Sequence, residues 1–521
     1  MNLQSSLSYQ PQELKFGTSG RRGEVIHLTD LEIYTNALAE LEYLQSLPWE
    51  AGGITRGEEF YLALDLRPSS TRICAAIERA VEDAGMQPVN MGRISTPALM
   101  YFATTRGKGS IMVTGSHIPF DRNGYKLNTS AGELLKEHEG PINQAVSRVR
   151  GRLYGQPFAE SIFNQKGMFK SGPSLPASAS DAADSEYVSR YIDFYGSAFL
   201  TGLRLAVYQH SAVARDTLVE ILQRLGADVV ACGRSEQFVP IDTENIDAGQ
   251  LAVIQELADA AGQIDAVVSV DGDSDRPLVL GLDRGSVRFF GGDVVGMITA
   301  EYLQADAVVV PITCNDAIDR GNLARVLEPK TRIGSPYVIA GMQQAREKGR
   351  RAICGWEANG GFLLGSDVER HGRTLKALPT RDAMLPILTV LGAARERGLP
   401  LIELFAQLPQ RYTRAALLRN YPRELSRKVV ERYSIPGDAT RQALAQVFSP
   451  ARGFSGIDRL DYTDGIRIYF ANGDVVHFRP SGNADEFRIY AVTDSQKRAD
   501  EIVQMGIAEP DGLLRSLSVE G

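Results

Sequence analysis

A strand, a helix and a second strand follow one another three times along this chain. The three copies lie at residues 58–93, 203–233 and 305–335. In the third copy the pattern predicts a helix over 315–329 and a strand over 330–335. Two parallel strands need a long crossover, usually a helix, so each copy predicts part of a mostly parallel sheet covered by helices. The fold class expected from the repeat is therefore α/β.

Length and linkers divide the chain further. With 521 residues the chain exceeds the size at which a single core stops growing, about 250–300 residues. Residues 171–185 are rich in Ser, Pro and Ala, which indicates a linker. From residue 421 onward the pattern changes, and Asn472-Gly473-Asp474 between two apolar runs predicts a hairpin in a smaller α+β domain. The domains are expected at 1–175, 186–300, 301–420 and 421–521.

Composition narrows the class of protein. The net charge of −8 argues against nucleic acid or an anionic membrane as a partner. No run of about 18 apolar residues is present, and the first residues lack the apolar core of a signal peptide. The four cysteines lie far apart and form no CxxC pair, as expected in a reducing compartment. These features predict a cytoplasmic protein without a nucleic-acid or membrane partner. A monomer or a dimer with a small-molecule substrate is a further expectation, which composition does not decide.

The first polar loop to consider follows the apolar residues 110–113 and contains Ser116. Sites in open α/β sheets lie at the carboxyl ends of strands. A hydrolase elbow would need glycine at Thr114 and Ile118, and His117 is too close in sequence to act as a base on Ser116. From these residues alone, a plain turn and a nucleophile remain open alternatives.

The second loop places Asp271, Asp273 and Asp275 directly after an apolar strand. Alternating carboxylates repel one another unless a cation neutralises them, and oxygen-only ligands suit a hard ion such as Mg²⁺. An EF-hand is excluded because Arg276 and Leu282 stand where Gly and Glu are required. Arg276 could reach a phosphate bound to the same ion. The alternative is a solvated acidic turn.

Two further loops carry groups that suit a sugar and a phosphate. Glu357 and Asn359 alternate after an apolar strand, and a carboxylate beside an amide can bind vicinal hydroxyls. Each of these loops alone could be a simple turn. The other loop could hold a phosphate, because it combines a guanidinium, a hydroxyl, a bare backbone amide and a side-chain amide. These groups belong to Arg479, Ser481, Gly482 and Asn483.

Taken together, the loops supply a serine, a metal cluster, a sugar site and a phosphate site. Transfer of a phosphoryl group needs a metal that neutralises the phosphoryl oxygens and an acceptor oxygen placed in line. The combination therefore indicates phosphoryl transfer on a sugar phosphate.

The four loops, in this order, resemble those of the α-D-phosphohexomutase superfamily, which includes phosphoglucomutases and phosphomannomutases. The resemblance also covers residues 15–23 and 123–127, and so spans nearly the whole chain. It implies three related mixed-sheet α/β domains plus a C-terminal α+β domain around a central cleft. It also implies an isomerase that interconverts hexose 1-phosphate and hexose 6-phosphate. The matching segments are Thr114–Pro119, Asp271–Arg276, Trp356–Gly360 and Arg479–Asp485.

The resemblance also implies roles for individual residues. Ser116 would carry the phosphoryl group and bind one Mg²⁺ together with Asp271, Asp273 and Asp275. A hexose 1,6-bisphosphate would be the intermediate and the activator. Groups near the transferred phosphoryl would be Arg21, His117, Lys126 and Arg276. Glu357 and Asn359 would bind the sugar hydroxyls. The distal phosphate would be held by Arg479, Ser481, Gly482 and Asn483, with Arg488 as a further candidate.

Several features depart from the superfamily pattern. Trp356 and Asn359 replace the usual Gly and Ser, Asn483 to Asp485 replace Thr-Glu-Pro, and no His lies near Ser335. The sugar is expected to be mannose or glucose, with glucosamine as the alternative. The general acid or base is left open among Lys126, His117 and His371, and Lys376 and Arg381 lie nearby in the sequence.

Two other functions remain possible from the sequence. A haloacid-dehalogenase-type phosphatase or mutase would use Asp271 as the nucleophile and Asp273 as the acid or base. The second alternative is a sensor that binds sugar phosphates without turnover. The intact serine and the three intact aspartates argue against it, because a sensor would not need both.

Overall fold

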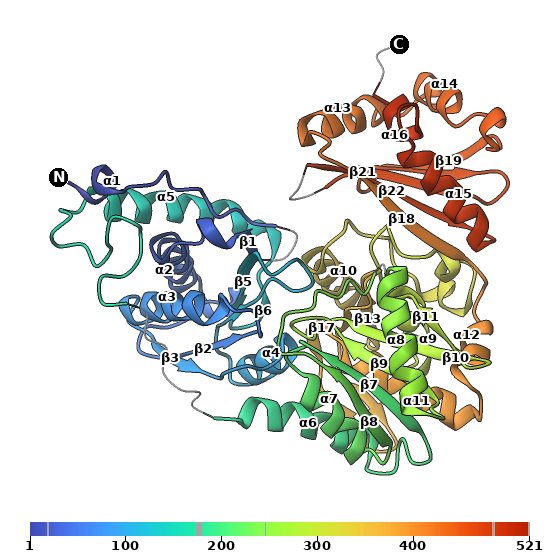
Figure 1. The fold of residues 1–521 in the computed structure, drawn as a ribbon, viewed down its shortest axis with the longest axis horizontal. Coiled ribbons are helices and arrows are strands. Elements are labelled where there is room, and N and C mark those ends of the chain that lie inside the picture. Colours follow the sequence, from blue (N-terminus) through green and yellow to red (C-terminus); the bar gives the residue numbers. More distant parts are fainter. Residues whose placement is uncertain (18–19, 173–179, 245, 482–484, 519–521) are drawn as a thin grey trace.

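The computed structural model describes residues 1–17, 20–172, 180–244, 246–481 and 485–518. In Figure 1 the N-terminal part and the C-terminal part stand on opposite sides, with the middle of the chain below and between them. Among the described residues four large sheets form, each with its own strand order. The predicted α/β class with an α+β C-terminal part is confirmed.

The first sheet has the order β1-β5-β4-β2-β3, with β6 beside β5. β2 pairs in parallel with β3 and β4, as the first predicted unit requires. Five of the six residues of β2 are buried, because helices cover the parallel part of the sheet. The elements are β1 Arg21–Glu24, β2 Glu59–Leu64, β3 Gln87–Asn90, β4 Ser110–Val113, β5 Arg122–Thr129, β6 Gly132–Glu133, α1 Leu3–Ser6, α2 Asp30–Ser46, α3 Ser70–Asp83, α4 Thr96–Thr105 and α5 Glu139–Gly155.

The second sheet has the order β11-β10-β9-β7-β8, and β7 pairs in parallel with both β8 and β9. The second predicted unit is thus confirmed. Residues 173–179 of the expected linker lie outside the described residues, and α6 already begins at Ala182. The elements are α6 Ala182–Tyr195, β7 Arg204–His210, α7 Arg215–Arg224, β8 Asp228–Arg234, α8 Ala248–Ala261, β9 Ala266–Val270, β10 Pro277–Asp283 and β11 Ser286–Phe290.

The third predicted unit is correct in its first strand and wrong after it. Residues 315–329 contain two short 3-10 helices, separated by Arg320 and Gly321, rather than one α-helix. Residues 330–335 contribute only an isolated bridge between Pro311 and Thr331. The crossover helix is α10, and β13 returns parallel to β12. The elements are α9 Gly292–Tyr302, β12 Ala307–Val309, α10 Ser335–Glu347, β13 Ile353–Trp356, β14 Phe362–Leu364, β15 Val368–Arg370, β16 Arg373–Leu375, β17 Leu378–Asp382, α11 Met384–Arg397 and α12 Leu401–Ala406.

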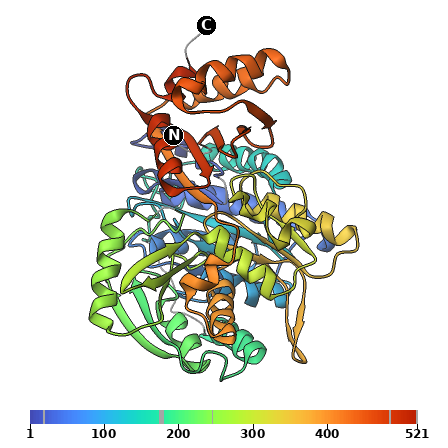
Figure 2. The same cartoon turned by 90° about the vertical axis from the view of Figure 1, so that its right-hand side faces the viewer.

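The C-terminal sheet is antiparallel, with the order β18-β22-β21-β20-β19. The predicted hairpin joins β20 and β21. Figure 2 shows this part at one end of the molecule, above the other three. The elements are β18 Tyr412–Arg419, α13 Arg423–Tyr433, α14 Asp438–Val447, β19 Ile457–Asp461, β20 Ile466–Phe470, β21 Val475–Pro480, β22 Glu486–Thr493, α15 Gln496–Ile507 and α16 Leu513–Ser516.

The strands that lead into the serine, aspartate and sugar loops share one hydrophobic core. Met112 of β4, Val268 of β9 and Trp356 of β13 all belong to the same buried cluster. The C-terminal part has a separate cluster that includes Phe478 and Ile489. A continuous core fixes the first three loops relative to one another, because close-packed interiors resist deformation. In the part of the chain that the structure describes, no helix is both long and apolar enough to cross a membrane.

Candidate active site

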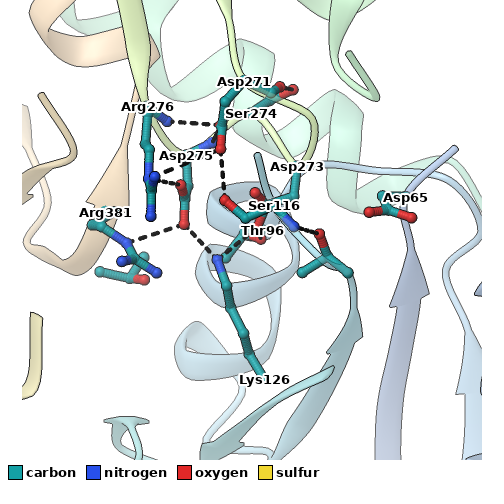
Figure 3. Close-up of polar contacts among 12 residues, drawn as sticks. Asp65, Thr96, Ser116, Lys126, Asp271, Asp273, Ser274, Asp275, Arg276 and Arg381 are labelled. Atoms are coloured by element: carbon teal, nitrogen blue, oxygen red, sulfur yellow. Dashed lines mark hydrogen bonds and ion pairs between the residues drawn. The ribbon is translucent and has the colours of Figure 1, made fainter. Parts of the chain in front are cut away.

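The serine loop begins where the buried strand β4 ends. Ser116 has a φ of 53°, a left-handed conformation that is uncommon for a residue other than glycine. Its backbone N–H donates to the Thr114 hydroxyl at 2.7 Å. The Ser116 hydroxyl donates to Asp271 Oδ2 at 2.8 Å, although the two residues are 155 positions apart in the sequence. Figure 3 shows the serine pointing from one loop toward the aspartates of another.

The three aspartates form one compact buried cluster. Asp271, Asp273 and Asp275 each offer a carboxylate oxygen, and these oxygens lie within 4.8 Å of one another. Burial, followed by the charges of the other two aspartates, raises the pKa of Asp271 well above its usual value. Burial would also raise the pKa of Asp273, but Lys126, the Thr96 hydroxyl and Arg381 together lower it. The basic groups beside the cluster therefore offset part of the repulsion among its carboxylates.

The donor chemistry of this cluster fits a hard divalent cation. Asp273 Oδ1 and Asp275 Oδ1 are buried and accept no hydrogen bond from the described residues. Buried carboxylate oxygens without a partner carry a high desolvation cost, which a bound ion would remove. With the nearby Ser116 hydroxyl, the available ligands are all oxygens, as Mg²⁺ prefers. The three aspartates that the sequence singled out do come together in the fold.

Three basic groups converge on the cluster from different elements. Lys126 Nζ, from β5, lies 2.6 Å from Asp273 Oδ2 and 2.5 Å from Asp275 Oδ2. Arg381 Nε, from β17, lies 3.1 Å from Asp275 Oδ2. Arg276 Nε lies 3.6 Å from Asp275 Oδ1 and forms no hydrogen bond there. Figure 3 shows Lys126 and Arg381 approaching Asp275 from separate strands.

His117 lies against Arg276 on the same side. Its Nδ1 is 2.7 Å from a terminal nitrogen of the Arg276 guanidinium. Burial, reinforced by Arg276, lowers the pKa of His117 well below its usual value, so the ring is neutral at pH 7. A guanidinium can only donate, so Nδ1 is the acceptor and the proton resides on Nε2.

The structure does not bring Arg21 to the serine. The Arg21 guanidinium is buried in the N-terminal domain, where it donates to Glu40 at 2.6 Å and to the Leu14 carbonyl. The next residue, Arg22, faces the other way. Burial lowers the pKa of Arg22 to about 10, and Asp273 is the charge that most opposes this effect. Arg22, and not the predicted Arg21, is therefore the N-terminal arginine near the aspartates.

The sugar loop is tied to the same network. Glu357 Oε2 lies 3.2 Å from the Arg381 guanidinium, so one arginine joins Glu357 to Asp275. The Asn359 side-chain oxygen accepts from the Gly361 N–H at 3.0 Å, and its backbone carbonyl accepts from the Thr243 hydroxyl at 2.8 Å. Glu357 is thus tied to the cluster, whereas the described contacts of Asn359 stay within its own loop and with Thr243.

The phosphate loop joins β21 to β22, two interior strands of the C-terminal sheet. Arg479 Nε lies 3.4 Å from Asp464 Oδ1, and the buried Ser481 donates its backbone N–H to the Glu486 carbonyl. Arg488 pairs with Glu486 at 2.8 Å. The predicted residues Gly482 and Asn483 lie outside the described residues. A cavity of about 570 Å³ beneath this sheet is lined by Glu244, Ala358 and Tyr490, among others.

Some residues considered from the sequence lie elsewhere, and others were missed. His371 stands at the exposed turn between β15 and β16, and Lys376 pairs with Asp367 at 2.8 Å. Neither has a described contact with the aspartates. Thr96 was missed, although it donates to Asp273 Oδ2 at 2.6 Å. Its position at the start of α4 gives only a helix-cap signal in the sequence.

Comparisons with known proteins agree with this geometry. The family of phosphoglucomutase/phosphomannomutase alpha/beta/alpha domains matches residues 13–151 with its domain I, 186–283 with domain II and 291–412 with domain III. A phosphomannomutase of Sinorhizobium fredii is 37% identical over 95% of this chain and 98% of the relative.

Solved structures share the fold. A phosphoglucomutase/phosphomannomutase family protein from Burkholderia thailandensis superposes with a TM-score of 0.69 at 18% identity, covering 98% of both chains. N-acetylphosphoglucosamine mutase from Aspergillus fumigatus, in complex with GlcNAc-6P and magnesium, gives a TM-score of 0.56 at 15% identity over 99% of this chain and 98% of its own.

The fold and the serine–aspartate site thus define an enzyme of the phosphohexomutase class. Within that class, the chain belongs to the phosphoglucomutase/phosphomannomutase family.

Proposed function

We propose that this protein is an isomerase that interconverts hexose 1-phosphate and hexose 6-phosphate, with mannose, glucose or both as the sugar. The observation that carries the proposal is the contact between the Ser116 hydroxyl and Asp271 in the buried aspartate cluster. A serine in this place can carry a phosphoryl group while cationic groups surround it. The phosphomannomutase name of the 37% identical relative supports mannose.

Ser116 gives its phosphoryl group to a free sugar hydroxyl, and later accepts the other phosphate of the resulting hexose 1,6-bisphosphate. In each transfer one P–O bond breaks and another forms, and the attacking hydroxyl loses a proton. His117 presents its Nε2–H, which suits donation to a phosphoryl oxygen. This leaves Lys126 as the group in the site that we propose to handle the proton. Arg276 and Arg22 offset the charge of the phosphoryl oxygens.

The metal that we propose is one Mg²⁺ per chain, held by Ser116, Asp271, Asp273 and Asp275. When bound, it neutralises charge on the phosphoryl oxygens. The proposal is supported by the two buried carboxylate oxygens of the cluster that accept no hydrogen bond from the described residues, and by the magnesium in the Aspergillus structure. The hexose 1,6-bisphosphate would also be the activator, because it can phosphorylate Ser116 in a resting enzyme.

Substrate recognition would divide between two loops. Glu357 and Asn359 would bind sugar hydroxyls, and the distal phosphate would be bound by Arg479, Ser481, Gly482 and Asn483. The Arg479 guanidinium is mostly buried beside Asp464, so it is already held in place for a bidentate contact. Arg488, paired with Glu486, is a further candidate.

We propose four domains near the predicted boundaries, with β18 counted in the fourth because it pairs with β22. A monomer or dimer in the cytoplasm, with no nucleic-acid or membrane partner, stays our prediction. It is supported by the net charge of −8 and by four cysteines that form no disulfide.

The proposed function is tested by a coupled assay that detects hexose 6-phosphate. Purified protein with Mg²⁺ and a trace of hexose 1,6-bisphosphate is given mannose 1-phosphate, glucose 1-phosphate or glucosamine 1-phosphate. We expect turnover of mannose 1-phosphate, glucose 1-phosphate or both. Because loss of one hydrogen bond costs only about 0.5–1.5 kcal/mol, we expect about 2- to 10-fold discrimination between these two sugars. Turnover of glucosamine 1-phosphate alone would contradict the sugar assignment.

A further inference from the structure

One buried arginine donates to four backbone carbonyl groups of the serine loop, defined here as residues 114–122. Arg67 donates to the backbone carbonyls of Ser116 at 2.7 Å, Pro119 at 2.7 Å and Arg122 at 3.0 Å, and also to that of Ile118. Its side chain is fully buried. Arg67 itself lies in the turn after β2, 49 positions before Ser116 in the sequence.

The Arg67 guanidinium is fixed from several sides. Asp65 Oδ2 accepts from its Nε at 3.2 Å, and Asp65 Oδ1 is in turn held by the Ser70 hydroxyl at 2.6 Å. The ring of Phe238, from the second domain, covers the guanidinium with its centroid 4.0 Å from Cζ. A planar group packed in this way has little freedom to reorient.

The loop has been shaped around this guanidinium. A Cβ at Gly115 would lie 2.6 Å from Arg67 Cζ, which explains glycine beside the serine. A Cβ at Gly272, in the aspartate loop, would lie 2.7 Å from the Ser116 carbonyl oxygen. The carbonyl of Ser116 is thus enclosed between Arg67 and the aspartate loop, while its hydroxyl faces Asp271. Such external support allows the left-handed φ of Ser116 to persist.

We propose that Arg67 is a positioning residue that holds the serine loop in the conformation that presents the Ser116 hydroxyl to the aspartate cluster. The inference rests on the proposed function, in which Ser116 carries the phosphoryl group. Arg67 acts through the loop backbone: among the described residues it forms no hydrogen bond or ion pair with the cluster, although the charges of Asp273 and Asp271 do act on its pKa. Lysine at this position would keep the charge but not the fork of donors that reaches four carbonyls.

The test compares Arg67→Lys with Gly115→Ala, which leaves Arg67 in the chain but pushes a methyl group against it. The control is Arg79→Lys, on the exposed side of α3, where Arg79 pairs with Asp83. We expect both test variants to lose about 100-fold in kcat, the loss typical of a displacement of about 1 Å, while KM changes less than about threefold. The rate of Ser116 phosphorylation by hexose 1,6-bisphosphate, followed by mass spectrometry, should fall by the same factor.

A second readout does not depend on activity. Amide hydrogen exchange of residues 114–122 should become at least about tenfold faster in Arg67→Lys, and should stay unchanged in Arg79→Lys. If the wild-type protein shows no mutase turnover, the proposed function is wrong. The hydrogen-exchange rates would still test whether Arg67 holds the loop. The inference is overturned if wild type is active and Arg67→Lys matches it in kcat and in loop exchange. The inference is also overturned if Gly115→Ala is fully active and the activity lost in Arg67→Lys is fully explained by a smaller fraction of folded protein in that variant.

Discussion

Replacing Ser116 with alanine is expected to lower mutase turnover by at least about 10⁴-fold, because loss of a covalent nucleophile removes the step itself. The substitution deletes one hydroxyl, whose described partner is Asp271. Alanine at a left-handed φ adds little strain beyond that of the serine it replaces, since both have a Cβ. Steady-state turnover of the preferred hexose 1-phosphate, at saturating bisphosphate, measures the effect.

The matched control is Ser147→Ala on α5, an exposed serine whose hydroxyl contacts only the helix backbone. It should retain full turnover. The rival reading, in which Asp271 is the nucleophile, predicts that Ser116→Ala keeps activity within about tenfold of wild type. Such a result would place the covalent step on the aspartate and would contradict the phosphoserine account.

Replacing Asp271 with asparagine is expected to weaken Mg²⁺ binding and turnover by at least about 100-fold each. The asparagine would retain a side-chain oxygen for the backbone N–H groups of Asp275 and Arg276, which Asp271 Oδ1 now accepts. The local fold should therefore survive. Calorimetric titration with Mg²⁺ gives the affinity, and the coupled assay gives the turnover.

Stability separates a lost ligand from a misfolded loop. Asp271 is crowded by two carboxylates, which raise its pKa together with burial. Removing its charge relieves that repulsion, so without metal the unfolding midpoint of Asp271→Asn should equal or exceed that of wild type. Asp283→Asn, at the exposed end of β10, is the control and should change neither property. Unchanged Mg²⁺ affinity in Asp271→Asn would show that the ion is not held by this cluster.

Part of the site could be read from local sequence because each loop follows a buried strand. Ser116 and Asp271 come directly after the apolar runs that form β4 and β9, and open α/β sheets place their sites at the carboxyl ends of strands. The strand pattern and the resemblance were therefore enough to predict that the serine loop and the aspartate loop lie close together.

The strand pattern could not show which arginine of the N-terminal segment lies near the aspartates. Arg21 and Arg22 are neighbours on β1, and successive side chains of a strand point to opposite faces. Arg21 pairs with the buried Glu40, whereas the side chain of Arg22, one position later, interacts with the charge of Asp273. The sequence alone does not say which face looks toward the serine, because that depends on pairing with β5.

Contacts between distant elements were also beyond the sequence pattern. Arg381 joins Asp275 to Glu357 only because β17 and β13 both flank β14 in the third sheet. The false helix over 315–329 has a similar origin. Its apolar spacing fits a helical period, but Arg320 and Gly321 separate two short 3-10 helices and the crossover is made by α10 instead.

The most direct test of the account follows one phosphoryl group. The protein is labelled at Ser116 with ³²P from a labelled hexose 1,6-bisphosphate, freed of small molecules, and mixed with unlabelled mannose 1-phosphate or glucose 1-phosphate and Mg²⁺. With Ser116 as the phosphoryl carrier, we expect label to leave Ser116 within one turnover and to be found in a hexose bisphosphate, and then in hexose 6-phosphate. Label that stays on the protein, resides on another residue, or is released only as inorganic phosphate would contradict this role.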